Sequence, residues 1–320
     1  MPFPTTLLEA VQYFSTFENC KAFMVAIRWS DSVVKCPTCG SSKVTWLENA
    51  RLWKCYSKHA RPKFSLKTGT IFEDSPLGLD KWLPVIWLLV NSKNGISSWE
   101  VHRAIGVTQK TAWFMLQRGR LALQDLSSNK IGGEVEVDET YIGGKARNMH
   151  KSRKLKTLGG KGGGAVGKTA IQGLLMRHGK VHARVVGEAK RGILVENVKE
   201  IVDKGSNVFT DDAVAYYGML DEYDHQVINH AEAYVKGNVH TNGIENFWSL
   251  LKRGLNGTYV SVEPYHLFRY VDEQAFRFNN RDMTDELRFR YAMRHIVGRR
   301  LTYRELTGKL EEGPTVEELF

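Results

Sequence analysis

Apolar and polar residues follow three different patterns along the chain. Aromatic and β-branched residues interrupted by turns fill residues 36–72, and helical periodicity runs through residues 78–125. From Glu134 onward, strand-like and helix-like segments alternate. We therefore predict an α+β protein with several domains.

The strand-like runs of the first pattern, "KVTWLE", "RLWKCY" and "KFSLKT", surround a group of possible metal ligands. The spacing is Cys36-x2-Cys39-x15-Cys55-x3-His59. Three thiolates and one imidazole complete a tetrahedral zinc site, and a closed site of this kind is structural. The pattern predicts a zinc ribbon with bound Zn²⁺.

Two positions near the ribbon bear on this ligand set. A ribbon usually has cysteine at position 58, where this chain has Lys58, so His59 is assigned from its type and its proximity. Cys20 is the competing thiol. It lies in a helix-like stretch before the ribbon, and we predict that it belongs to the core.

The helical region contains two helices separated by a turn. Ser97 and Ser98 are the candidates to cap the first helix, Gly106 is placed to form the turn, and Thr108 is placed to cap the second helix. This spacing is that of a helix-turn-helix, whose second helix would present Gln109, Lys110 and Arg118 to the DNA major groove. A helical hairpin packed on the core is the alternative. The apolar positions expected to pack inward are Val101, Ala104, Ile105, Ala112, Met115 and Leu116.

Three carboxylates stand out in the last pattern. "GGEVEVDETYIGGK" places Asp138 at the end of a predicted strand, and "SNVFTDDAVAYYG" places Asp211 at the end of another. "HTNGIENFWSLLKRGL" is an amphipathic helix pattern with Glu245 and Lys252 on one face, seven residues apart. Two strand-end aspartates and a helix glutamate suit a pair of Mg²⁺ or Mn²⁺ ions in phosphoryl transfer. The helix residues expected to face inward are Ile244, Phe247, Trp248 and Leu251.

"GGGAVGKT", from Gly162 to Thr169, matches the phosphate-loop pattern, so a nucleotide-hydrolysing enzyme has to be considered. A phosphate loop must open a helix. Here the following residues, "TAIQGLLMRHGKVHARVV", predict a β-hairpin with its turn at His178 and Gly179, and we expect no nucleotide.

The stretch from Lys145 to Lys168 is basic and glycine-rich. It contains eight lysines or arginines, six glycines and no acidic residue. This composition predicts a mobile loop that closes on DNA phosphates. The residues expected to make these contacts are Lys151, Arg153, Lys154 and Lys168.

Composition adds charge to this interpretation. The chain has 320 residues, of which 42% are hydrophobic and 25% charged, with a formal net charge of +10 that favours a polyanionic partner. The densest apolar run, Trp82–Val90, is too short to span a bilayer. Four cysteines in a chain of this size suit a metal site better than a disulfide framework. We expect a cytoplasmic protein associated with the nucleoid.

Three segments resemble the DDE transposases of bacterial insertion sequences of the ISXO type, relatives of the Merlin elements. They are "VEVDETYIGGK", "TDD…AYYG" and "NHAEAYVKGNVHTNGIENFWSLLKRGLNGTY". "CPTCG" and "KFSLKTGTIFEDSPL" are similar to the N-terminal part of that family, so the resemblance runs from about Cys36 to about Arg281. It implies a ribonuclease-H-like catalytic domain, Mg²⁺ dependence, and pairing of two transposon ends by an oligomer that is at least a dimer.

The resemblance also assigns roles to residues. It makes Asp138, Asp211 and Glu245 the catalytic metal ligands, and it places Lys252, with its neighbour Arg253, at DNA phosphates. Asn242 lies one turn before Glu245 and is the alternative third ligand.

Two further polar residues lie beside this predicted site. Asp212 follows Asp211, but strand alternation lets only one of the two point into the site. His240 would either support the metal ligands or act as a structural hydrogen-bonding residue.

These motifs divide the chain into predicted domains. They are an N-terminal helical segment at 1–30, the zinc ribbon at 31–75, the helix-turn-helix region at 76–128, the DDE transposase domain at 129–285 and a helical tail at 286–320. The expected function is recognition of terminal inverted repeats, followed by cleavage and transfer of DNA strands into target DNA. A DNA-binding regulator without catalysis and a structure-selective nuclease of the same fold are the alternatives.

Overall fold

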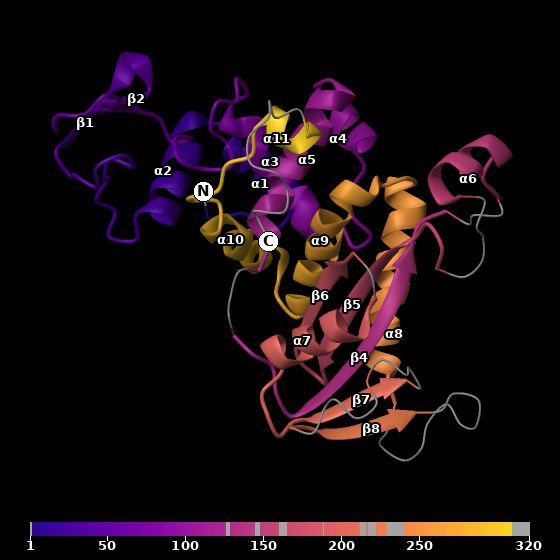
Figure 1. Ribbon diagram of the computed structural model, residues 1–320. Helices are drawn as coiled ribbons and strands as arrows, with labels where there is room; N and C mark the ends of the chain where they lie inside the picture. Colours follow the sequence, from indigo (N-terminus) through magenta and orange to yellow (C-terminus); the bar gives the residue numbers. More distant parts are fainter. Residues whose placement is uncertain are drawn as a thin grey trace. The chain divides into compact units, whose positions relative to one another are not determined.

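The computed structural model of the protein is shown in Figure 1. The residues that it describes are 2–125, 129–144, 148–159, 165–187, 189–211, 216, 222–228 and 240–308, and the side chains of residues 153 and 157 are not described. The chain divides into two compact units. One consists of Met1–Ser92, Ile96–Leu123 and Asp282–Phe320, and the other of Lys93–Gly95 and Gln124–Arg281.

The first unit contains helices from both ends of the chain. They are α1 (Leu7–Phe14), α2 (Phe17–Arg28), α3 (Leu79–Asn91), α4 (Ser98–Ile105), α5 (Gln109–Leu123), α10 (Asp285–Arg294) and α11 (Tyr303–Thr307). Their aromatic side chains meet around Phe289 of α10, whose ring centroid lies 5.4 Å from that of Phe23 and 5.1 Å from that of Trp87. The segment predicted as a tail therefore contributes to the core of this unit.

The predicted ribbon strands are confirmed. β1 (Val44–Leu47), the 3-10 turn η1 (Glu48–Ala50), β2 (Leu52–Cys55) and β3 (Lys63–Phe64) form an antiparallel sheet in that order. Trp53 is the centre of its small core. Its ring lies 4.4 Å from Trp46 and 5.8 Å from Phe64, between centroids.

The two predicted helices of the middle region are α4 and α5. Ser97 caps α4, Gly106 ends it in the left-handed conformation with φ 63°, and Thr108 accepts a 3.1 Å hydrogen bond from the Thr111 N–H. Val101 and the three predicted positions of α5 are buried, as expected. Ala104 is exposed, because the short helix α4 buries only a narrow stripe around Val101.

The second unit is built on a five-stranded mixed sheet. Its strands are β4 (Glu134–Ile142), β5 (Thr169–Met176), β6 (Val181–Val186), β7 (Asn207–Asp211) and β8 (Asp224–Ile228), in the order β6-β5-β4-β7-β8. β4, β5 and β6 pair antiparallel, whereas β7 and β8 run parallel to β4. Thr169 begins β5 rather than a helix, and β5 and β6 form the predicted hairpin around His178 and Gly179.

Helices cover both faces of this sheet (Figure 1). Val135 and Val137 of β4 pack with Leu194 and Val198 of α7 (Arg191–Ile201), while Ile171 of β5 packs on α8. The remaining elements of this unit are α6 (Lys151–Leu158), α8 (Asn242–Arg253), the π-helical turn η4 (Gly254–Tyr259), the 3-10 turn η5 (Pro264–His266) and α9 (Leu267–Asn279). The four predicted inward residues of α8 are all buried.

Helix α6 corrects one prediction. The basic stretch from Lys145 to Lys168 was expected to be a loop throughout, yet eight of its residues are helical. The helical part contains no glycine and ends at Gly159, which has φ 56°. Leu158 packs over Gly167, where a Cβ would lie 3.0 Å from Leu158 Cδ2. Glycine content was thus a poor guide to the middle of this stretch.

Candidate active site and zinc centre

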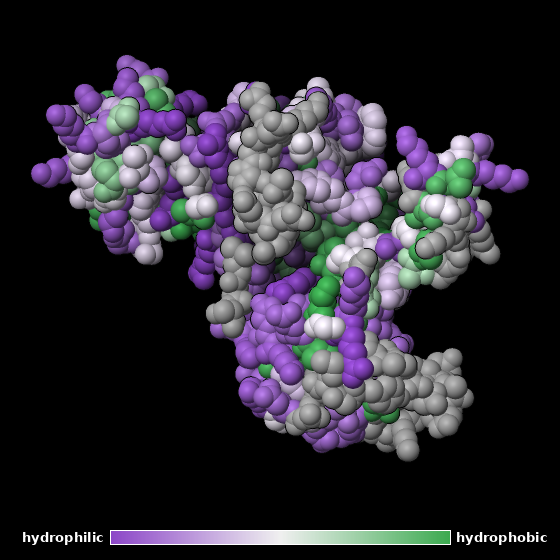
Figure 2. Space-filling view, viewed as in Figure 1, coloured by the Kyte–Doolittle hydropathy of each residue, from purple (hydrophilic) through white to green (hydrophobic). Residues whose placement is uncertain are grey.

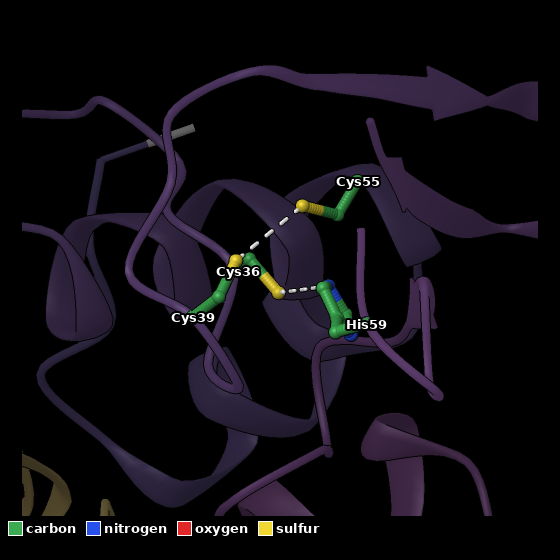
Figure 3. Close-up of side chains that lie close together, drawn as sticks. All are labelled: Cys36, Cys39, Cys55 and His59. Atoms are coloured by element: carbon green, nitrogen blue, oxygen red, sulfur yellow. Dashed lines mark hydrogen bonds between the residues drawn. The ribbon is translucent and has the colours of Figure 1, made fainter. Parts of the chain in front are cut away.

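The four predicted zinc ligands lie together (Figure 3). Cys36 Sγ is 3.5 Å from His59 Nε2, and Cys39 Sγ is 3.6 Å from Cys55 Sγ. All four ligand atoms lie within 4.8 Å of one another. With Zn–S bonds of about 2.3 Å, a tetrahedral site has sulfur atoms about 3.8 Å apart, so the cluster fits a structural Zn²⁺.

Cys20 is separate from this cluster and is a core thiol, as predicted. Its side chain is 1% exposed, and its Sγ donates a hydrogen bond of 3.2 Å to the carbonyl of Phe14. Burial raises the pKa of this thiol to about 12, which keeps it protonated at neutral pH. A protonated, buried thiol is a poor metal ligand.

The strand register explains how Asp138 and Asp211 come together. The parallel pairing of β4 with β7 ends at Val137 and Thr210. Asp138 and Asp211 are each the next residue, so both side chains leave the sheet at the same level and on the same face. Asp211 ends β7 as predicted, but Asp138 does not end β4. That strand continues to Ile142 because β5 keeps pairing with it.

Helix α8 supplies the third acidic residue. Glu245, Trp248, Ser249 and Lys252 are spaced by three, four and seven residues and lie on one face of the helix. Together with three residues of β4 they line a pocket of about 410 Å³. The three strand residues are Asp138, Glu139 and Thr140. Neither Asn242 nor Asp211 is among the residues that line this pocket.

The electrostatics of the pocket oppose negative charge. Burial, together with repulsion from Asp211 and Glu245, raises the pKa of Asp138 to about 6. Two hydrogen bonds act in the opposite direction: Glu139 N–H donates to Oδ1 over 2.7 Å, and Trp248 Nε1 donates to Oδ2 over 2.9 Å. A cation in the pocket would relieve the repulsion.

Comparison with known proteins identifies the family of two parts of the chain. Residues 15–58 match the transposase zinc-ribbon domain, and residues 130–279 match the ISXO2-like transposase domain. The chain belongs to the ISXO2-like transposases. It is also 27% identical over 260 residues to an uncharacterized protein in transposable element ISH50 of Halobacterium salinarum, covering 77% of this chain and 85% of that relative. These findings support an insertion-sequence transposase.

Three features of the pocket were not indicated by the sequence motifs. Trp248 was assigned only to the core, but its indole N–H also reaches Asp138. Gly173 pairs with Asp138 across β4 and β5, and a Cβ there would lie 2.6 Å from the Trp248 ring, so glycine is required for the indole to sit there. A glycine inside a strand next to a predicted ligand was the available signal.

Glu139 is the third missed feature. Burial, together with repulsion from Asp138 and Asp211, raises the pKa of Glu139 to about 7. The Tyr216 hydroxyl donates a hydrogen bond to its carboxylate and accepts one of 3.0 Å from Gln172 Nε2. Gln172 in turn accepts a 2.9 Å hydrogen bond from Asn197 on α7. A buried polar network therefore supports the pocket from the other face of the sheet.

The structure contradicts the prediction for one of the residues expected to contact DNA. Arg118 was expected to face the major groove, but it is 3% exposed. Its guanidinium donates to the carbonyl of Glu73 and lies 5.6 Å from the Trp82 ring centroid. Arg118 falls on the buried stripe of α5, next to Met115 and Leu116, so its role is structural.

The other basic positions differ in their surroundings. Lys110 is exposed and its Nζ lies 4.7 Å from the Tyr303 ring centroid, while Gln109 donates a 2.8 Å hydrogen bond to Ser98. Lys252 lines the pocket and Arg253 is exposed at the end of α8. Lys151 and Lys154 lie on α6, where Figure 2 shows a hydrophobic spot between hydrophilic residues, and Lys168 precedes β5.

Two of the predicted positions lie wholly or partly outside the part of the chain that the structure describes. They are Asp212 and the side chain of Arg153. His240 is described, and its Nδ1 lies 3.3 Å from Glu136 Oε1. Among the described residues, no helix combines the length and the apolar character needed to cross a membrane.

Proposed function

We propose that the carboxylate pocket is the catalytic centre for Mg²⁺-dependent cleavage and transfer of DNA strands. The observation that carries this proposal is the equal offset of Asp138 and Asp211 beyond the last parallel pair of β4 and β7. Glu245 faces the same pocket from α8. The resulting triad is the one that the resemblance to DDE transposases implies.

The donor set fits Mg²⁺ or Mn²⁺. The three side chains offer only hard oxygen atoms, and burial together with repulsion from Asp211 and Glu245 raises the pKa of Asp138. Bound ions would activate the attacking water or 3′-hydroxyl and stabilise the leaving oxygen. Asp138, Asp211 and Glu245 are the ligands that we assign, in preference to Asn242.

The chain's own residues have distinct roles in this proposal. Trp248 holds Oδ2 of Asp138 through its indole N–H and so fixes the orientation of this carboxylate. Lys252, at the opposite end of the same helix face from Glu245, is placed to bind the DNA phosphate next to the bond that breaks. The mixed sheet order agrees with the ribonuclease-H-like architecture that the resemblance implies.

Recognition of the transposon ends is assigned to the first unit. Helices α4 and α5 would act as a helix-turn-helix in which Gln109 and Lys110 face DNA, and the zinc ribbon would add further contacts. Lys151, Arg153, Lys154, Lys168 and Arg253 would bind phosphates. Because cleavage and joining need two paired ends, we expect a homo-oligomer that is at least a dimer, acting at the nucleoid.

A cleavage and joining assay on a plasmid that carries the element's own ends tests this proposal. Wild-type protein should cut and join in Mg²⁺, and Asp211→Asn should do neither while still binding the ends. Asp224→Asn is the matched control, since Asp224 is an exposed acid on the neighbouring strand β8. Binding of the ends with no Mg²⁺-dependent cleavage by either wild type or Asp211→Asn would favour a non-catalytic regulator. Cleavage without joining would favour a nuclease.

A further inference from the structure

Glu136 is a buried carboxylate on β4 that the proposed reaction does not use. It lies two residues before Asp138, so both side chains are on the same face of the strand. Its side chain is 1% exposed. Oε2 accepts a 2.9 Å hydrogen bond from the backbone N–H of Ile244, in the first turn of α8. This contact satisfies one of the N–H groups that a helix leaves free at its start.

Arg177 completes the contact from the end of β5. Its Nε donates to Glu136 Oε1 over 3.0 Å, and its Nη2 donates to the carbonyl of His240 over 2.8 Å. The guanidinium carbon also lies 4.1 Å from the ring centroid of Phe209 on β7. Glu136 and Arg177 together therefore hold the first turn of α8 and the backbone at His240, two residues before the helix begins.

The first turn of α8 lies very close to the sheet. At Gly243 a Cβ would come within 2.6 Å of Leu175 Cδ2 and 2.8 Å of Glu136 Oε2. The next contact reaches the metal ligand itself, because Thr241, which is 1% exposed, donates a 3.3 Å hydrogen bond to Glu245 Oε1. The position of Glu245 is thus connected to Glu136 within one turn of helix.

We propose that the Glu136–Arg177 pair is a positioning element, which fixes the first turn of α8 and thereby sets where Glu245 meets Asp138 and Asp211. The proposal rests on the catalytic function given above. A buried ion pair contributes little net stability compared with an apolar pair of similar size. A contribution to stability therefore does not explain the Glu136–Arg177 pair, whereas positioning of α8 does.

The first test needs no metal. In Glu136→Gln, the amide can accept from either Ile244 or Arg177, while its NH₂ group faces the other donor. Hydrogen exchange at the Ile244 amide should become about tenfold faster, whereas exchange in the last turn of α8 should stay unchanged. Glu222→Gln is the matched control, because it breaks an exposed pair with Lys204 in the same unit. Unchanged exchange at Ile244 would overturn the proposal.

The second test follows metal dependence. The Mg²⁺ concentration for half-maximal cleavage should rise about tenfold in Glu136→Gln, with the KM for end DNA unchanged. A purely structural defect would instead lower the rate equally at every Mg²⁺ concentration. If Asp211→Asn retains full activity, the catalytic proposal fails. If Asp211→Asn is inactive while Glu136→Gln matches wild type in Mg²⁺ dependence, only the positioning proposal fails.

A double variant covers the case in which Glu136→Gln does not fold. Replacing both Glu136 and Arg177 by Met removes the buried charges and keeps side-chain bulk, so the Tm should return toward that of wild type. Exchange at Ile244 should remain fast and the Mg²⁺ midpoint should remain raised, since the helix still lacks its acceptor. Recovery of the wild-type midpoint in this double variant would contradict the proposal.

Discussion

The zinc cluster and the proposed Mg²⁺ site differ in where their ligands come from and in how those ligands are held. The zinc ligands lie between positions 36 and 59, and four soft or borderline donors form a closed set. The three proposed Mg²⁺ ligands come from β4, β7 and α8, with Asp138 and Glu245 far apart in the sequence. In the ribbon the metal organises a small core, whereas in the pocket a large core organises the ligands.

This contrast predicts which site fails when its surroundings change. The ribbon has a core of a few aromatic residues around Trp53, too small to be stable without its metal. The pocket stands on two hydrophobic clusters, one on each face of the sheet. Loss of its ions should therefore leave the second unit folded.

The largest effect is expected from the pocket's own ligands. Asp211→Asn should lower strand cleavage by at least about 100-fold, because it removes a charged ligand from a site that depends on metal ions. Zinc content should stay at that of wild type, since the ribbon does not depend on the pocket. Parallel measurement of cleavage and of zinc by atomic absorption checks this. Loss of zinc in Asp211→Asn would show that the two sites depend on each other.

The next effect concerns the ribbon. Cys55→Ser should abolish stoichiometric zinc binding and unfold the ribbon, because a serine hydroxyl cannot replace a thiolate ligand. Affinity for end DNA should fall as a result. Hydrogen exchange of the β4–β8 sheet should be unchanged. Cys20→Ala is the control and should keep its zinc, since Cys20 Sγ bonds to the Phe14 carbonyl outside the cluster.

A smaller effect is expected on the stability of the pocket in the absence of Mg²⁺. The pKa of Asp138 is raised from 3.8 to about 6, so its favourable contribution is complete below pH 3.8 and is lost as the pH rises to about 6. Asp138→Asn cannot ionise and should be more stable than wild type at pH 8, by on the order of 1 to 3 kcal/mol. Calorimetry at pH 4 and pH 8 checks this. An advantage of the same size at both pH values would disagree with the stated cause.

The smallest effect concerns DNA recognition. Lys110→Ala should weaken binding to end DNA and reduce the slope of log affinity against log salt by about one, as expected for one lost phosphate contact. Arg118→Met should not change the slope, because Arg118 is buried, although it should lower the Tm. Fluorescence anisotropy at several salt concentrations separates the two. A changed slope for Arg118→Met would mean that this side chain reaches DNA after all.

The sequence was most informative where the chemistry was local. The ribbon ligands, both helix caps around Gly106 and the buried face of α8 follow from spacing alone, because each depends on residues within a few turns of each other. That Asp138 and Asp211 lie on strands could also be predicted, although β4 continues beyond Asp138 to Ile142. That they share one level in the sheet depends on register, which no single strand specifies.

The predictions that failed depended on tertiary contacts. Arg118 has the spacing of a groove-facing residue, yet it is buried on the core face of α5 and its guanidinium reaches the Glu73 carbonyl. α6 lies within a glycine-rich stretch, and Leu158 packs over Gly167 near the end of that stretch. The sequence also contains no sign of the role of Glu136. Its carboxylate accepts a hydrogen bond from the first turn of α8, a contact between segments far apart in the chain.

The close approach of Trp248 to Gly173 limits how this protein can evolve. A single nucleotide change that gives position 173 a side chain displaces the indole, and with it the oxygen of Asp138 that the indole holds. Replacing Trp248 by a smaller residue leaves an empty space above Gly173. A substitution at only one of these two positions should impair the protein. Among functional relatives we therefore expect positions 173 and 248 to change together or not at all.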